Sequence, residues 1–254
     1  MLEKILKCMP PSIKANKICR SLYGALFVKS NFKKTQSIVM DVGQNYILPY
    51  TLLYDFDTVL DIGAGPDTYI ADFFIKNGKI VYAIDIKKQN SYKHKNYHFI
   101  EGDFMTHVFS QKFDAVWASH VLEHVQNTGL FLDKVYDLIK DDGIFFCIVP
   151  PHKTQIVGGH VTIGWNIGIL MYNLLLCGFD VKQGRFKKHG YNIAAFVNKR
   201  SDKILPDGLH RDFGDIEILK EYWPDEDYFR QNFEGDILEW NWFKSETLIN
   251  GNIR

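Results

Sequence analysis

The sequence has few cysteines and no long apolar segment, and each shortage excludes a class of protein. Its four cysteines include no Cys-x-x-Cys pair, which argues against a secreted disulfide scaffold. Cys147 and Cys177 lie in apolar runs and are expected to be buried thiols in a reducing cytoplasm. The longest apolar run, residues 163–179, is interrupted by glycine and asparagine and is too short for a membrane span. The N-terminus also lacks the continuous apolar stretch of a secretory signal.

Net charge is absent too, because 30 basic residues balance 30 acidic ones. No global field therefore attracts nucleic acid. The charges are uneven along the chain, since residues 1–34 are basic and residues 207–239 are acidic. The basic residues are scattered, as on a solvated helix face, so no nucleic-acid partner is expected. The sequence does not decide whether either charged segment mediates a homodimer.

Hydrophobic patterning divides the chain into three predicted parts. These are an N-terminal helical cap (1–50), an α/β domain expected to bind the ligand (51–200) and an acidic, aromatic extension (201–254). Short apolar runs predict strands at 58–62, 80–84, 98–101, 113–118, 144–149, 179–186 and 191–197. Helical segments are predicted up to residue 77 and at 128–140 and 164–177, with a turn at 141–143. This alternation predicts a doubly wound, mostly parallel seven-stranded sheet with an antiparallel finish.

A strand–turn–helix motif begins the α/β domain, with the sequence Val-Leu-Asp-Ile-Gly-Ala-Gly-Pro at residues 59–66. Asp61 lies near the end of an apolar strand, and Gly63 and Gly65 form a turn into a helix. Glycine permits the tight turn and lets a ligand approach the backbone. An ordinary strand-to-helix turn has the same features, so the motif is informative only in combination with other ligand-binding residues.

Acidic residues end or succeed the next two strands. Asp85 closes the second strand, ahead of Ile86, where a carboxylate can accept both hydroxyls of an adenosine ribose. Asp103 comes after the third strand in Glu-Gly-Asp-Phe. Its carboxylate could accept the adenine amino group, with the Phe104 ring against the base. The three motifs together predict an adenosine-containing ligand.

The combined motifs resemble the class I S-adenosylmethionine (SAM)-dependent methyltransferases. The resemblance covers about residues 55–200 and includes Phe-Asp-Ala-Val at 113–116 and Val-Leu-Glu-His-Val at 121–125. It implies a Rossmann-like methyltransferase fold with SAM as the cofactor. The implied contacts are Asp61, Gly63 and Gly65 at the methionine end, Asp85 and Ile86 at the ribose, Asp103 and Phe104 at adenine, and Ser119 and His120 from the fourth strand. Pro66-Asp67 departs from the pattern, because many members have a further glycine there.

A nicotinamide dehydrogenase is the alternative for the same fold. The glycine loop lacks the third glycine of the dinucleotide fingerprint. Asp61 would also place a carboxylate where a pyrophosphate would bind, which is electrostatically unfavourable. SAM instead brings a cationic amino group and a sulfonium, so the same carboxylate attracts it.

A histidine-rich cluster succeeds the fourth strand. His120, Glu123 and His124 are spaced i, i+3, i+4, which places them on one face of a helical turn. His152 and His160 come after the fifth strand and are expected at the same sheet edge. Imidazole and carboxylate groups suit Zn²⁺, Fe²⁺ or Mn²⁺, so His120, Glu123, His124 and His160 form a candidate metal site. Some small-molecule and RNA methyltransferases have a similar site, whereas metal-free members use Leu-Glu-His-Val to shape the pocket.

The expected function is transfer of the SAM methyl group to an oxygen of a small polar acceptor. Glu123, His124 and His160 are the candidate catalytic residues, as a base or as metal ligands. The loop at 150–166 is expected to form a wall for the acceptor, with Trp165 either in that wall or in the core. Its Pro-Pro-His and Gly-Gly-His segments resemble methyltransferases of bacterial surface-polysaccharide precursors, which modify sugar hydroxyls or phosphoramidate groups. An RNA-terminal methyltransferase and a non-catalytic SAM-binding or partner module remain alternatives.

Overall fold

The computed structural model divides the chain into two compact units. The first comprises Met1–Asp55 with Phe243–Arg254, and the second comprises Phe56–Trp242. The structure describes residues 44–87, 92–152, 158–162, 164–200, 202–212, 214–224 and 237–243. Most of the predicted N-terminal cap, and residues 225–236 and 244–254 of the acidic extension, therefore lie outside the described residues.

In the first unit, the described residues begin with a short helical segment. α4 spans Gln44–Ile47, and the 3₁₀ helix η1 spans Leu48–Leu53. A proline in the first turn of η1 is favourable, because it has no N–H group that would lack a helical partner. The ring of Tyr50 stacks on Phe243, with 5.1 Å between centroids. Residues from both ends of the chain thus contact each other inside this unit.

The second unit alternates strands and helices. Its strands are β1 (Thr58–Ile62), β2 (Ile80–Asp85), β3 (Tyr97–Glu101), β4 (Phe113–Ser119), β5 (Ile139–Val149), β6 (Arg185–His189), β7 (Asn192–Asn198) and β8 (Glu239–Trp240). Its helices are α5 (Tyr69–Lys76), η2 (Leu122–His124), α6 (Thr128–Leu138), α7 (Ile167–Leu176), α8 (Asp215–Ile218) and η3 (Lys220–Tyr222). None of the helices in the described ranges has the length and hydropathy needed to cross a bilayer.

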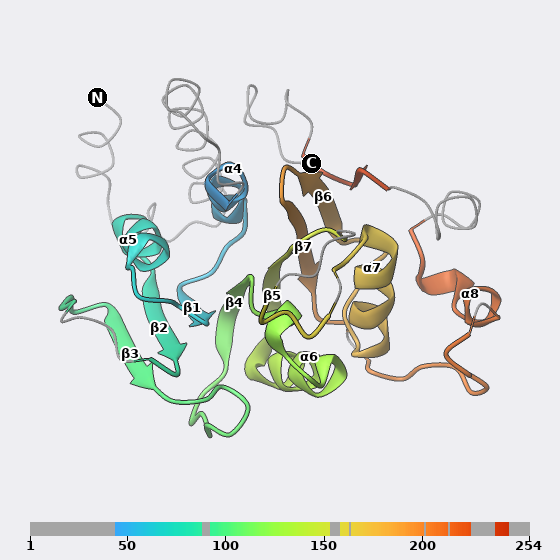
Figure 1. Cartoon of the computed structure of the whole chain (residues 1–254), viewed down its shortest axis with the longest axis horizontal. Coiled ribbons are helices and arrows are strands. Elements are labelled where there is room, and N and C mark those ends of the chain that lie inside the picture. The colour runs from blue at the N-terminus through green and yellow to red at the C-terminus, as the bar shows by residue number, and fades with distance from the viewer. Residues whose placement is uncertain are drawn as a thin grey trace. The chain divides into compact units, whose positions relative to one another are not determined.

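The strands form one mixed sheet in the order β3-β2-β1-β4-β5-β7-β6-β8 (Figure 1). The strands from β3 to β5 are parallel, and β7, β6 and β8 are antiparallel to their neighbours. The predicted doubly wound, mostly parallel sheet is confirmed. The predicted number of seven strands was wrong, because the described residues include an eighth, β8. That strand has only two residues, too few to produce an alternating pattern in the sequence.

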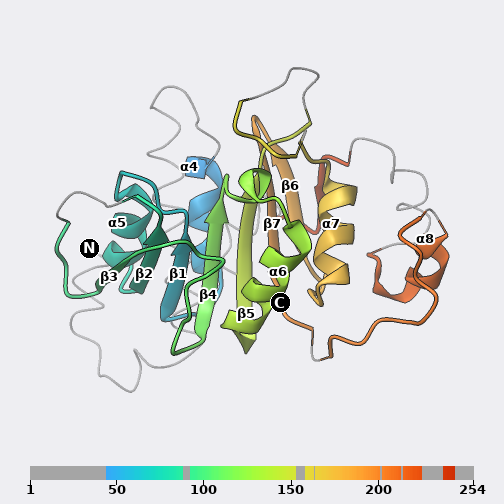
Figure 2. The same ribbon diagram turned by 60° about the horizontal axis from the view of Figure 1, so that its bottom comes forward.

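The chain reverses its direction across the sheet between β1 and β4. From β1 it proceeds outward to β2 and β3, then returns to β4 and continues to β5 on the other side. Parallel crossovers are right-handed, so α5 and α6 lie on opposite faces of the sheet (Figure 2). Open sheets of this kind bind ligands beyond the carboxyl ends of the strands at such a switch point.

Local sequence explains where the flanking helices begin and end. Asn166 caps α7, because its side-chain oxygen accepts the N–H of Ile169 at 2.7 Å. Gly78 lies just after α5 with φ of +81°, and the N–H groups of Gly78 and Lys79 bond back to the carbonyls of Ile75 and Phe74 at 2.9 and 3.0 Å. This pair of bonds is a Schellman motif. The predicted glycine C-cap is therefore confirmed.

Two predicted boundaries were wrong. The turn predicted at 141–143 lies inside β5, because Phe113 pairs with Ile139 and Ala115 already pairs with Ile144. Residues 140–142 bulge out of register and stay exposed, so turn-forming side chains are tolerated within a strand. The strand predicted at 179–186 begins only at Arg185, because a turn closed by Gly184 N–H on the Val181 carbonyl precedes it.

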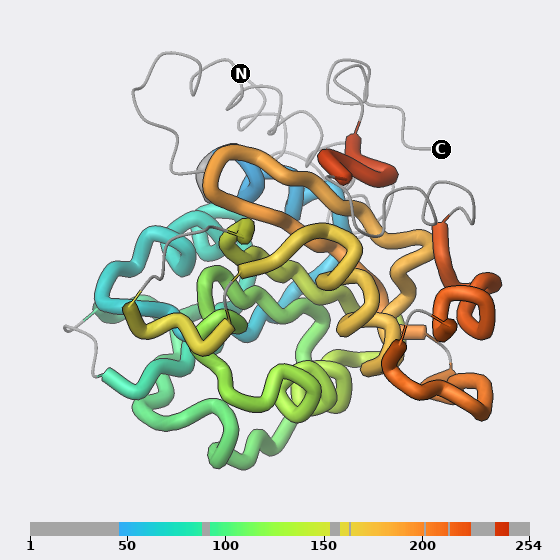
Figure 3. Tube along the Cα trace, turned by 45° about the vertical axis from the view of Figure 1, so that its right-hand side comes forward, coloured from blue at the N-terminus to red at the C-terminus, as the bar shows by residue number. Residues whose placement is uncertain are grey.

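The described part of the C-terminal extension before residue 225 packs within the second unit. It runs beside α7 (Figure 3), where the Tyr172 hydroxyl donates a hydrogen bond to the buried Asp215 carboxylate. Asp215 also accepts the N–H groups of His210 and Arg211 at 2.9 and 3.0 Å. Three donors on one carboxylate anchor this segment to the helix.

Candidate active site

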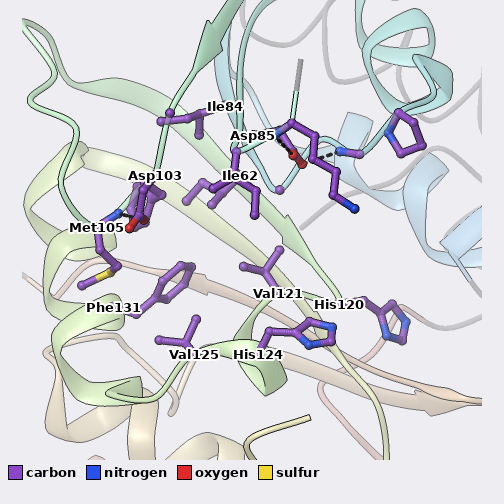
Figure 4. A pocket seen from close by; sticks show the side chains of 17 residues that line it. Ile62, Ile84, Asp85, Asp103, Met105, His120, Val121, His124, Val125 and Phe131 are labelled. Atoms are coloured by element: carbon purple, nitrogen blue, oxygen red, sulfur yellow. Dashed lines mark hydrogen bonds between the residues drawn. The ribbon is translucent and has the colours of Figure 1, made fainter. Parts of the chain in front are cut away.

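A pocket of about 630 Å³ opens at the carboxyl edge of the sheet, beside the switch point (Figure 4). Among the described residues it is lined by Ile62, Gly63, Gly65, Pro66, Ile84, Asp85, Ile86, Lys87, Gly102, Asp103, Phe104, Met105, His120, Val121, His124, Val125 and Phe131. Mostly apolar walls with a few polar groups, in a volume of about 300–1,000 Å³, are typical of cofactor sites. The lining includes every residue expected at the cofactor except Asp61 and Ser119.

The glycine turn forms one end of the pocket. Gly63 and Gly65 have φ of +69° and +68°, in the left-handed region that favours glycine. The N–H of Gly63 bonds to the Ile84 carbonyl at 2.9 Å, which ties the turn to the end of β2. A Cβ on Gly63 would lie 2.6 Å from Cγ2 of Val121, whereas a Cβ on Gly65 would meet nothing within 4 Å. Only Gly63 is therefore required by packing as well as by backbone conformation.

Asp85 joins the glycine turn to the loop after β2. Its Oδ2 accepts the N–H of Gly65 at 2.9 Å, and its Oδ1 accepts the N–H of Lys87 at 2.8 Å. Each carboxylate oxygen can accept more than one hydrogen bond, so both can still receive ribose hydroxyls. Ile86 lies between Asp85 and Lys87 in the chain, and its side chain is largely exposed at the pocket rim.

The loop after β3 forms the opposite end. Asp103 accepts the N–H of Met105 at 2.8 Å, and the ring of Phe104 is buried against Phe131 with 5.0 Å between centroids. Lys134 fixes this loop by donating to the carbonyls of Met105 and His107 at 2.9 and 2.7 Å. The pattern of the sequence did not reveal Met105 and Phe131 as pocket residues, because apolar side chains there are equally typical of a core.

Asp61 lies behind the glycine turn and is only 3% exposed. Burial raises its pKa to about 7, and the nearby Asp67 and Asp85 carboxylates contribute. A cation that enters the pocket would favour the charged form again, whereas an anion would disfavour it further. The electrostatics therefore fit the ammonium and sulfonium of SAM and oppose a pyrophosphate. Ser119, at the end of β4, is half-buried beside this edge.

His120 directly succeeds β4 and connects two distant parts of the chain. Its Nδ1 lies 3.1 Å from Oε1 of Glu123, and its Nε2 lies 2.8 Å from Oδ1 of Asn192. Burial alone would lower the pKa of His120, but the hydrogen bonds to Glu123 and Asn192 outweigh it and raise the pKa. Both partners are acceptors, which favours a ring protonated on both nitrogens.

Glu123 is completely buried, although it carries a carboxylate. One oxygen contacts His120, and the other, Oε2, is buried with no hydrogen-bond partner in the described part of the chain. A buried carboxylate oxygen without a partner is costly. This atom is therefore a candidate ligand for a group that the protein binds.

His124 and His160 complete the cluster. The Nδ1 of His124 lies 2.7 Å from the carbonyl of Gly159, and a carbonyl only accepts, so Nδ1 carries the proton and Nε2 keeps its lone pair. The His160 ring stands edge-on to His124, with 5.0 Å between centroids. One ligand atom from each of Glu123, His124 and His160 lies within 4.8 Å of the other two.

The structure arranges the cluster differently from the sequence expectation. The expected face of a helical turn is a three-residue 3₁₀ turn, η2, and His120 precedes it with φ of +55°. The group of potential metal ligands comprises Glu123, His124 and His160, while His120 contacts Glu123 and Asn192. A short turn after a strand cannot place the first histidine where an α-helix would.

The described residues of the loop after β5 place one side chain, His160, in the histidine cluster. Trp165 is 4% exposed and belongs to the hydrophobic core. Of the two predicted places for this side chain, the core is therefore correct and the acceptor wall is not. His152 is exposed, and its N–H bonds to the Trp165 carbonyl at 2.9 Å. The N–H of Val161 bonds to the Glu123 carbonyl at 2.7 Å, which brings His160 to the cluster. Residues 153–157 and 163 of this loop lie outside the described residues.

Comparisons with known proteins agree with this fold. A 1,6-didemethyltoxoflavin N1-methyltransferase from Burkholderia thailandensis, solved with 1,6-didemethyltoxoflavin and S-adenosylhomocysteine, is 17% identical with a TM-score of 0.53, covering 72% of this chain and 91% of that chain. A Bacillus halodurans methyltransferase is 14% identical with a TM-score of 0.51, covering 61% and 98%. Human N-acetylserotonin methyltransferase in complex with SAM is 15% identical with a TM-score of 0.50, covering 73% and 68%. A search of curated proteins found no match.

The strand order and the carboxyl-edge pocket define a Rossmann-like methyltransferase fold. Residues 60–147 match the model of the methyltransferase domain family. This matched region and the fold are similar to those of SAM-dependent methyltransferases.

Proposed function

We propose that this enzyme methylates an oxygen of a small polar acceptor, with a divalent metal ion held by Glu123, His124 and His160. The observation that carries the proposal is the meeting of these three side chains at the end of β4, beside the pocket that His124 lines. The orphaned Oε2 of Glu123 supports it, because a cation would satisfy that buried oxygen.

On the cofactor side, the pocket residues orient SAM, and their negative charge complements its positive charge. The glycine turn and Asp61 accommodate the cationic methionine end, Asp85 accepts the ribose hydroxyls, and the loop at Asp103 receives adenine. Methyl transfer is an in-line displacement, in which the acceptor oxygen bonds to the methyl carbon while the carbon–sulfur bond breaks and its electron pair stays on sulfur. The pocket residues contribute by holding the methyl group toward the histidine cluster.

On the acceptor side, the three side chains suit Zn²⁺, Fe²⁺ or Mn²⁺ better than Mg²⁺, since two of the three donors are imidazole nitrogens. Three protein ligands leave a coordination position for an acceptor oxygen, and a bound ion would lower the pKa of that hydroxyl. Gly159 keeps His124 in the tautomer whose Nε2 can act as ligand. If no ion is bound, His124 or His160 accepts the acceptor proton as general base.

A surface-polysaccharide precursor, carrying a sugar hydroxyl or a phosphoramidate group, is the proposed acceptor. The support is the resemblance of the Pro-Pro-His and Gly-Gly-His segments to enzymes of that type. A pocket of this size also suits a small acceptor beside the cofactor better than a long polymer. An assay with nucleotide-sugar acceptors and with RNA oligonucleotides separates this proposal from RNA-terminal methylation.

Chelation tests the metal directly. Purified enzyme, dialysed against a chelator, is expected to lose turnover and to regain it with Mn²⁺, Zn²⁺ or Fe²⁺ under reducing conditions. Elemental analysis of the untreated enzyme should find about one ion per chain. Full turnover of metal-free enzyme would refute the metal and leave the histidines as base and positioning groups.

A further inference from the structure

Asn192 is a buried polar residue with no place in any sequence motif. It begins β7, whose next residue, Ile193, pairs with Val149 at the carboxyl end of β5. Its side chain is 3% exposed. The amide nitrogen donates to the His189 carbonyl at 3.4 Å, so the oxygen Oδ1 faces Nε2 of His120 at 2.8 Å.

His120 lies between Asn192 and Glu123, and contacts of both its ring and its backbone hold it in place. Both ring nitrogens have acceptor partners, and the ring stacks on Tyr191 at 6.0 Å between centroids with planes 16° apart. The backbone N–H bonds to the Ile148 carbonyl at 2.9 Å. His120 nevertheless has φ of +55°, in the left-handed region that residues other than glycine adopt uncommonly. Strain maintained by surrounding bonds is typical of functional sites.

The chain of contacts ends on Glu123. His120 contacts Oε1, which leaves Oε2 as the atom without a partner among the described residues. Oε2 belongs to the same carboxylate that groups with His124 and His160. The orientation of this ligand thus depends on His120, and the orientation of His120 depends on Asn192.

We propose that Asn192 is a positioning residue of the metal site, which acts through His120 to present Oε2 of Glu123 to the ion. This inference rests on the proposed metal-assisted function. It assigns β7 a role in the chemistry, although β7 provides no ligand. It also explains why His120 contacts the cluster without belonging to the ligand group.

Titration of the metal-free, full-length protein with Mn²⁺ and with Zn²⁺ tests the proposal by calorimetry, without any acceptor. Asn192→Leu has nearly the same shape but no acceptor oxygen, and should weaken metal binding about tenfold, as loss of outer contacts does in other metal sites. Asn192→Asp keeps an acceptor and should stay within about threefold of the wild type. Melting temperature and SAM affinity serve as controls for folding. If Asn192→Leu does not fold, Asn192→Ser, whose hydroxyl is too short to reach His120, replaces it.

A double-mutant cycle shows whether the two residues act as a chain. His120→Ala should weaken metal binding about 10- to 100-fold, and adding Asn192→Leu should cause no further loss, because the contact is already absent. Unchanged metal affinity in Asn192→Leu, or losses that multiply in the double variant, would overturn the inference. His124→Ala separates failure of the positioning role of Asn192 from failure of the proposed metal site. If it loses the metal while Asn192→Leu does not, only this inference fails, whereas if His124→Ala retains the metal, the proposed site itself is wrong.

Discussion

The two ends of the carboxyl edge are constructed in different ways. At the cofactor end, the hydrogen bonds that shape the site span at most 29 residues, as from Lys134 to Met105, and include the shorter contacts of Gly65 to Asp85 and Met105 to Asp103. At the histidine end, His124 contacts a carbonyl 35 residues away and His120 contacts Asn192, 72 residues away. The contact between the glycine turn and Asp85 can therefore form once β1 and β2 pair. The histidine end requires β4, the loop after β5 and β7 to be in place together.

The electrostatics of the two ends differ as well. The cofactor end has carboxylates close to one another, and burial, together with their repulsion, raises the pKa of Asp61. The histidine end has one buried carboxylate surrounded by imidazoles. The first arrangement attracts a cationic cofactor, and the second suits a metal ion or proton transfer. Substitutions should accordingly separate SAM affinity from turnover.

The largest effect is expected from His124→Ala. Turnover should fall by about 10²–10⁴-fold, whether the side chain acts as base or as metal ligand. SAM affinity should stay within about threefold, because the cofactor end retains its contacts. His94→Ala, which removes an exposed histidine from the loop before β3, is the matched control and should turn over like the wild type. Initial rates and calorimetry measure the two quantities, and an equal loss in both would contradict the separation of the two ends.

The glycine turn provides the next largest effect. Gly63→Ala and Gly65→Ala both force a side chain into the left-handed region, at about 1–2 kcal/mol each. Only Gly63→Ala also meets Val121, at 2.6 Å, which should add about 1–3 kcal/mol. Denaturant unfolding measures the difference, and Val121→Ala should recover part of it in the Gly63→Ala background. Equal losses in the two single variants would show that the turn does not depend on the η2 side of the pocket.

Asp85→Ala should weaken SAM binding by about 1.5–3 kcal/mol, since contacts to a charged acceptor are lost. The released N–H groups of Gly65 and Lys87 would also loosen the turn. Binding of Mn²⁺ to the histidine cluster should not change. Asp142→Ala, in the exposed bulge of β5, removes the same charge at a distance and serves as control. SAM affinity unchanged in Asp85→Ala would refute the ribose contact.

The smallest effect is a pH dependence. Because the pKa of Asp61 is about 7, SAM that binds below this pH must first displace a proton. The dissociation constant should therefore increase by up to about tenfold per pH unit as the pH falls below 7. Asp61→Asn should remove this dependence. Calorimetry at pH 6 and 8 measures it, and an identical slope in Asp61→Asn would show that another group is responsible.

The same residue affects stability in the opposite sense. A carboxyl group whose pKa is raised by folding stabilises the folded state below its unfolded pKa of about 4, and this contribution is lost as the pH rises through about 7. Asp61→Asn should therefore be more stable than the wild type at pH 8 when SAM is absent. Thermal unfolding with and without SAM distinguishes this gain from the loss of cofactor affinity.

Much of the cofactor end was predictable from the sequence. β1 has the predicted bounds, and the acidic residues at the ends of the next strands do border the pocket. These features depend on short-range requirements, namely an apolar strand, a glycine with positive φ and an acidic side chain at a strand end. Such requirements are visible in a few consecutive residues. The apolar lining at Met105 and Phe131 was not recognised, because burial in a core and burial under a cofactor select the same residue types.

The histidine end could be predicted only in part. The sequence by itself determined that Glu123 and His124 lie together after β4, since they are adjacent in the chain. The tertiary structure decided that the turn is η2 rather than an α-helix, that His160 returns to the cluster, and that Asn192 is the partner of His120. The physical reason is that a hydrogen bond across 72 residues has no local periodicity. It exists only because β7 pairs antiparallel with β5 and so begins at the edge where β4 ends.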